Sequence, residues 1–147
     1  MIPKRWPSPA TIAVAFLAWG CAGDGTGLDE FGNLAGSNSI ELGPTLNALQ
    51  QHVFNPLCTQ CHTGAAAPLG LVLDSGYAQQ SLVDVPSIEI PALFRVTPGN
   101  PDSSYIVWKV EGRSDIVGAR MPLGMQPLSS EQISAIREWI ANGAEAN

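Results

Sequence analysis

The stretch "CTQCH", residues 58–62, contains two of the three cysteines and one of the two histidines in this chain of 147 residues. Its Cys-x-x-Cys-His spacing is compatible with three kinds of chemistry: a redox-active dithiol, part of a zinc site, or covalent attachment of a haem. A structural zinc site needs four ligands, and no second paired motif accompanies this one. A thiol oxidoreductase places its motif beside a βαβ pattern, which the flanking sequence lacks.

Covalent haem attachment requires Cys-x-x-Cys-His, and that pattern is present here. Two thiols separated by one helical turn can add to the two vinyl groups of a single porphyrin, and the next imidazole then lies beneath the iron. The sequence therefore predicts one covalently bound haem c, held through Cys58 and Cys61, with His62 as its proximal iron ligand. The zinc and thiol-redox interpretations remain as less favoured alternatives.

Helical patterns precede and follow the motif. In "PTLNALQQHVF", residues 44–54, Leu46, Leu49 and Val53 have the spacing of one helix face, and Pro56 is expected to end or bend this helix. The clearest helix is "SSEQISAIREWIANG", residues 129–143. It begins with a capping box at Ser129 and carries isoleucines along one face, at positions 133, 136 and 140.

Two shorter helices are expected between these. One starts near Ser75 in "DSGYAQQSLV", and the other occupies "DSSYIVWKVEG", with Asp102 or Ser103 as its cap and Gly112 as its stop. The chain shows no convincing alternating strand, and its twelve prolines and fifteen glycines favour short elements joined by long loops. The predicted fold is all-α, with three or four short helices.

The last hundred or so residues carry a resemblance that extends beyond the pentapeptide. "RVTPGNPDSSYIVWKV", residues 95–110, and "RMPLGMQPLSSEQISAIREWIANGA", residues 120–144, follow CTQCH in the order found in bacterial class I c-type cytochromes. Residues 40–147 thus resemble a class I cytochrome c domain. The resemblance implies an all-α fold in which the first and last helices pack together and cradle one haem.

The same resemblance implies further roles in the site. Met121, followed by Pro122, matches the sixth iron ligand, and His/Met ligation raises the reduction potential of a haem. Met125 is expected to fill space in the core, with an exchange of the two methionines as the alternative. Pro98 matches the proline whose carbonyl accepts the proximal imidazole N–H in such domains.

Two other side chains have less definite expectations. Arg95 either neutralises a haem propionate or is solvated. His52 lies ten residues before His62 and is expected to be a partly exposed helical residue and not an iron ligand.

The N-terminus has the pattern of a secretory signal. Lys4 and Arg5 precede the uncharged run "ATIAVAFLAW", and "AWGC" resembles the lipobox of bacterial lipoproteins. We expect residues 1–20 to be a signal peptide of the lipoprotein type, Cys21 to receive lipid, and residues 21–39 to form a flexible Gly-rich tether. Ordinary signal cleavage near Gly20 is the alternative.

Charge and ligation together indicate a function. Removal of residues 1–20 takes two of the seven basic side chains and none of the thirteen acidic ones, which leaves a net charge of −8. A protein this acidic is not expected to bind nucleic acid.

The prediction is an exported one-electron carrier or accessory subunit on the periplasmic or outer side of a bacterial membrane. It is not an enzyme, it exchanges electrons with redox proteins, and it touches the membrane only through Cys21. The alternative is a catalytic or gas-sensing haem protein with an open sixth position.

Overall fold

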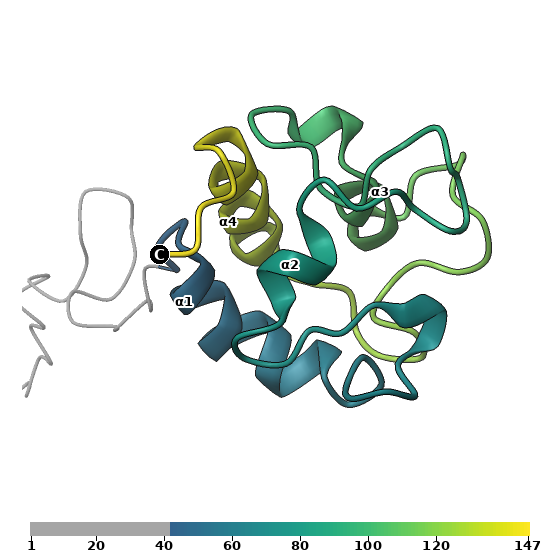
Figure 1. Cartoon of the computed structure of the whole chain (residues 1–147), viewed down its shortest axis with the longest axis horizontal. Coiled ribbons are helices and arrows are strands. Elements are labelled where there is room, and N and C mark those ends of the chain that lie inside the picture. Colours follow the sequence, from purple (N-terminus) through teal and green to yellow (C-terminus); the bar gives the residue numbers. More distant parts are fainter. Residues whose placement is uncertain (1–41) are drawn as a thin grey trace, which may run out of the picture. The chain divides into compact units, whose positions relative to one another are not determined.

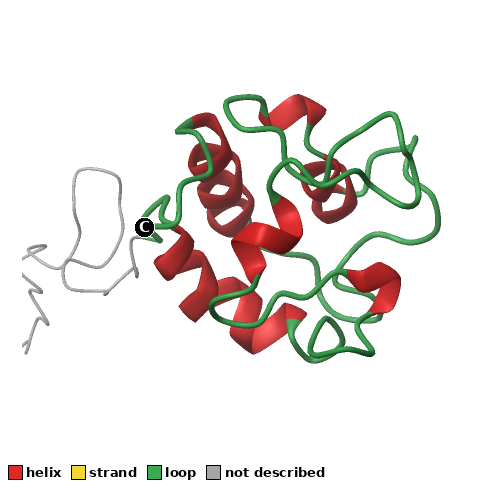
Figure 2. Ribbon diagram, viewed as in Figure 1, coloured by secondary structure: helices red, strands yellow, loops and turns green. Residues whose placement is uncertain are grey.

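The computed structural model describes residues 42–147, and the predicted signal peptide, lipidation site and tether lie outside this range. Four α-helices are present in the described part: α1 (Leu46–Leu49), α2 (Ala78–Leu82), α3 (Tyr105–Glu111) and α4 (Ser130–Ala141). The π-helix η1 (Gln50–Cys58) continues α1, and two 3₁₀ turns, η2 (Pro68–Gly70) and η3 (Pro101–Ser103), lie in the loops. Figure 2 shows the long loops that join these helices.

The described residues form an all-α unit, as predicted. Residues 42–147 contain no strand, and their β-type pairing is confined to three isolated bridges, which involve Val83, Val96, Pro86, Phe94 and Ser104. None of the helices in this part of the chain is long and apolar enough to span a membrane.

The first helix is longer than expected because Pro56 does not end it. The Thr45 side chain caps α1, and the helix then runs through Pro56 to Cys58 with π-type hydrogen bonds, such as the one from Thr59 N to the Phe54 carbonyl. Proline removes one helical N–H donor, so a nearby carbonyl loses its partner. The Gln132 side chain on α4 donates to the carbonyl of His52, at 3.5 Å, and so connects α4 to the first helix one turn before Pro56.

Helix α4 forms as the sequence predicts. The Ser129 hydroxyl accepts a hydrogen bond from Gln132 N, and the Gln132 side chain accepts one from Ser129 N, which completes the capping box. Ile136 and Ile140 are fully buried and Ile133 is partly buried against the same core. Figure 1 shows the yellow α4 beside the blue α1, and α4 also packs against α3.

The two middle helices begin later than predicted. Helix α2 starts at Ala78 and not near Ser75. Helix α3 starts at Tyr105, with Ser104 in the N-cap position, because Asp102 and Ser103 belong to the preceding 3₁₀ turn η3. The predicted stop is confirmed: Gly112 has φ +71°, a left-handed conformation that glycine adopts without strain.

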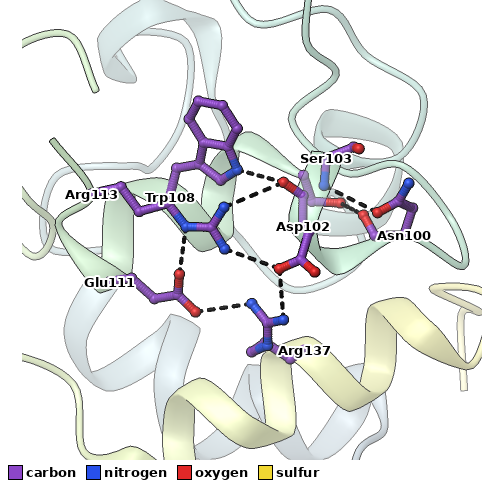
Figure 3. Close-up of polar contacts among 8 residues, drawn as sticks. Asn100, Asp102, Ser103, Trp108, Glu111, Arg113 and Arg137 are labelled. Atoms are coloured by element: carbon purple, nitrogen blue, oxygen red, sulfur yellow. Dashed lines mark hydrogen bonds and ion pairs between the residues drawn. The ribbon is translucent and has the colours of Figure 1, made fainter. Parts of the chain in front are cut away.

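A cluster of ion pairs connects η3, α3 and α4 (Figure 3). Arg137 on α4 contacts both Asp102, at 2.8 Å, and Glu111, at 2.9 Å. Arg113 contacts the same two carboxylates from the loop after α3. The cluster includes Glu111 of α3, and other residues of α3 line the cavity described next.

Candidate functional site

The described residues enclose a cavity of about 260 Å³ whose wall is mainly apolar. One part of the wall is formed by Cys58, Cys61 and His62. Another part is formed by Met121 and Met125. The structure therefore brings together all four residues that the sequence predicts as a haem site, although 58 residues of chain lie between His62 and Met121.

The CTQCH motif lies where the first helix ends. Cys58 is the last residue of η1, and its carbonyl accepts hydrogen bonds from Cys61 N, at 3.2 Å, and His62 N, at 2.9 Å. This turn keeps both thiols and the imidazole on the cavity wall. The two cysteines are free thiols.

The imidazole of His62 is oriented by a backbone carbonyl. Its Nδ1 lies 3.1 Å from the Leu71 carbonyl oxygen, and because a carbonyl can only accept, Nδ1 must carry the proton. Nε2 is then the unprotonated nitrogen that can bind a metal. The expectation that Pro98 supplies this carbonyl is wrong: the segment after η2 lies against His62, and Leu73 N also donates to the His62 carbonyl.

The electrostatic environment keeps the imidazole neutral. Burial lowers the pKa of His62, and the positive charges of Arg95 and Lys109 act in the same direction, while the hydrogen bond to Leu71 opposes them. With a pKa below the ordinary 6.5, the ring is uncharged at neutral pH. A neutral imidazole with a free Nε2 is the form that binds iron.

The two thiols differ in their surroundings. Cys58 is partly buried against the core and Cys61 is exposed. Burial raises the pKa of Cys58 to about 11. Cys58 is therefore a neutral thiol at neutral pH in the haem-free chain.

The two methionines sit in one loop, between α3 and α4. Met121 is half-buried, and its N–H donates to the carbonyl of Lys109, at 2.9 Å. Met125 is 39% exposed, so the expectation that it fills space in the core is wrong. Because the loop turns between the two residues, Met121 is the more enclosed of two thioethers on the same wall.

Arg95 has a role that neither sequence expectation included. Its guanidinium donates to the carbonyls of Leu69, at 2.6 Å, and Ser81, at 2.8 Å. Arg95 thereby holds the segment that carries Leu71 beside His62. His52, as expected, is a half-buried helical residue, and it is not part of the cavity wall.

Three polar residues on the wall were not predicted from the sequence: Glu89, Tyr105 and Lys109. Lys109 is only 8% exposed and forms an ion pair with Glu89, at 3.1 Å. Charged side chains are seldom buried unless they are paired, so the pattern of an amphipathic helix does not reveal such a residue. Glu89 comes from a proline-interrupted loop for which no contact could be predicted.

Comparison with models of protein families, with curated proteins and with solved structures returned no match. Among residues 42–147, no three His, Cys, Asp or Glu side chains are grouped as they would be to hold a metal ion. The cavity and the side chains of its wall are therefore the observations on which a proposed function can rest.

Proposed function

We propose that this chain is an exported monohaem cytochrome c of the class I type that carries single electrons. The observation that supports the proposal best is the apolar cavity on whose wall CTQCH and the Met121 loop meet. A haem bound there would supply an iron that alternates between the ferric and ferrous states. Cys58 and Cys61 would hold it covalently, and His62 and Met121 would be its axial ligands.

The residues of the cavity fit such a group. Apolar side chains form most of the wall, and several of them are buried, among them Val53, Phe54, Leu73, Leu82 and Ile136. This lining excludes water, which suits the flat apolar porphyrin and affects its reduction potential. His62 meets the other requirement, since its Nδ1 is engaged by Leu71 and its Nε2 is free.

Ligation by His62 and Met121 would leave no iron position open to a substrate, and this favours electron transfer over catalysis. The edge of the cavity carries exposed apolar side chains: Leu69, Ile88, Leu123 and Met125. Electron-transfer partners meet through small transient interfaces, and this rim is suited to such a contact with a donor or acceptor protein. Export and a lipid at Cys21 belong to the same proposal and rest on the N-terminal sequence.

The first experiment tests covalent attachment. The full chain is produced in a host able to attach haem, and the denatured protein is separated on a reducing gel. Haem-dependent peroxidase staining should remain in the wild type, because thioether bonds survive denaturation, and should be weakened or lost in Cys58→Ala and Cys61→Ala. A wild-type band without stain would refute the cytochrome proposal. The zinc and thiol-redox interpretations of the motif would then be favoured.

The second experiment separates a carrier from a haem enzyme or sensor. The wild type should be low-spin in the ferric state, show the weak charge-transfer band of sulfur ligation, and resist carbon monoxide. Met121→Ala should lose the band, bind carbon monoxide and have a lower potential. Met125→Ala, on the same wall, is the matched control and should keep all three properties.

The reverse pattern in the two variants would assign the ligand to Met125 and leave the carrier function intact. A wild type that is high-spin and binds carbon monoxide readily would instead support the alternative with an open sixth position.

A further inference from the structure

Lys109 is a buried cation on the cavity wall that the proposed function does not use. It lies on α3, and its ammonium donates to the Val117 carbonyl, at 2.8 Å, and pairs with Glu89, at 3.1 Å. Both partners are themselves outside α3: Glu89 lies in the loop before it and Val117 in the loop after it. An ammonium removed from water is costly unless it is paired and hydrogen-bonded, so these contacts fix where Lys109 and its partners can lie.

The backbone of Val117 is held from both sides. Its N–H donates to the Tyr105 hydroxyl, at 3.1 Å, while its carbonyl accepts from the Lys109 ammonium. Tyr105 and Lys109 are four residues apart on α3, and this spacing places both side chains on one face of the helix. Gly118 follows directly, and a Cβ there would lie within 4.0 Å of the ammonium and of the Glu89 carboxylate.

The backbone of residue 109 also binds the backbone of Met121, independently of the lysine side chain. The Lys109 carbonyl accepts the N–H of Met121, so α3 binds the loop at Val117 and again four residues later. Exposed loop segments ordinarily have few such contacts and low local stability. Here Val117 is 49% exposed, yet both of its backbone polar groups are bonded to α3 side chains.

We propose that Lys109, together with Tyr105, is a positioning residue that holds the Met121 thioether on the cavity wall. The inference rests on the proposed function, since it gives Met121 the role of iron ligand. Lys109 does not touch the iron in this arrangement. It acts through the backbone of residues 117–121, and its ion pair with Glu89 sets the position of the ammonium.

The test compares three variants of the full haem-loaded chain. Lys109→Met keeps the length of the side chain and removes the ammonium, and Tyr105→Phe removes only the hydroxyl that accepts from Val117. The matched control is Glu111→Gln, which also breaks ion pairs on α3, but on the side that faces Arg113 and Arg137 (Figure 3). A variant that merely weakens α3 would resemble this control.

Two readouts are measured in each variant. The first is amide hydrogen exchange at Val117 and Met121, which reports loop opening without reference to the iron. In Lys109→Met exchange should rise about tenfold at both amides, because the loop opens more readily once the ammonium no longer donates to the Val117 carbonyl, and a hydrogen bond is worth about that factor. In Tyr105→Phe it should rise at Val117, whose N–H loses its acceptor, and in Glu111→Gln it should stay unchanged. The second is the sulfur charge-transfer band, which should weaken in Lys109→Met, with carbon monoxide binding gained in its place.

The outcomes separate this inference from the proposed function. A wild type without a sulfur band would refute ligation by Met121, while the exchange data would still show whether Lys109 holds the loop. Unchanged exchange in Lys109→Met would overturn the inference, even with the band lost, because Lys109 would then act on the cofactor and not on the loop. Equal changes in Glu111→Gln would also overturn it. If Lys109→Met does not fold, Tyr105→Phe decides by the same criteria.

Discussion

The thiol of Cys58 allows a quantitative test of the cavity in the haem-free chain, produced in a host that cannot attach haem. Burial raises the pKa of Cys58 from 9.0 to about 11. The thiolate is the form that reacts with alkylating agents. At pH 8 the thiolate fraction falls from about one in ten at the ordinary pKa to about one in a thousand at a pKa of about 11. Alkylation of Cys58 should therefore be about a hundredfold slower in the folded chain than in the unfolded one.

The assay is alkylation by iodoacetamide at pH 8, with and without urea, followed by mass spectrometry of the peptides. Cys61, which is exposed, is the internal comparison and should be labelled readily in the folded chain. In the haem-loaded protein neither cysteine should be labelled, because both sulfurs are then in thioether bonds. A slower alkylation of Cys58 than of Cys61 in the haem-free chain thus reports the burial of Cys58. The loss of alkylation at both cysteines in the haem-loaded protein reports covalent attachment of the haem.

The pH dependence of this protection has a definite direction. The folded-state pKa of Cys58 is raised above the unfolded value, so the associated stability is fully present below about pH 9 and is lost as the pH rises through about 11. The alkylation rate in the folded chain should increase about tenfold for each pH unit over that interval. Equal rates for Cys58 with and without urea at pH 8 would refute its burial on the cavity wall.

Three other changes have expected results. Arg137→Met removes two ion pairs of the cluster in Figure 3, so the melting temperature should fall at low salt and the difference should shrink at 1 M salt; a salt-independent loss would contradict an electrostatic role. Ser129→Ala breaks the capping box of α4 and should lower the free energy of unfolding by about 1 kcal/mol in urea denaturation, with an unchanged value as the contrary result. Cys21→Ser should move the exported protein from the detergent phase to the aqueous phase; a wild type already in the aqueous phase would end the lipid-anchor prediction.

Several elements could be predicted because their signals are local. The capping box at Ser129, the apolar face of α4 and the stop of α3 at Gly112 each depend on residues within a few positions of one another. The all-α character followed from the same helical periods and from the absence of alternating strands. The haem, its ligation and the electron-carrier function remain predictions that the experiments above test.

The predictions that differ from the structure concern residues whose contacts are distant in the sequence or lie in irregular loops. Pro56 is expected to end or bend the first helix, and of these two outcomes the structure excludes the first, because a π-type pattern continues the helix to Cys58. Met125 was expected in the core, but the loop that holds it turns outward after Met121. Pro98 was expected beside His62 on the basis of a motif, whereas its neighbour Gly99 donates to the Ile140 carbonyl at the end of α4.

The sequence by itself determined the helical segments, the capped start of α4 and the glycine that ends α3, and it supplied the hypothesis for the chemistry at residues 58–62. Only the tertiary structure decided that the Leu71 carbonyl orients His62, and that Lys109 and Tyr105 hold the segment before Met121. The physical reason is that each buried polar group must find a partner when the chain collapses. That partner is whichever donor or acceptor the packed loops bring within reach, and the spacing of residues along the chain does not specify it.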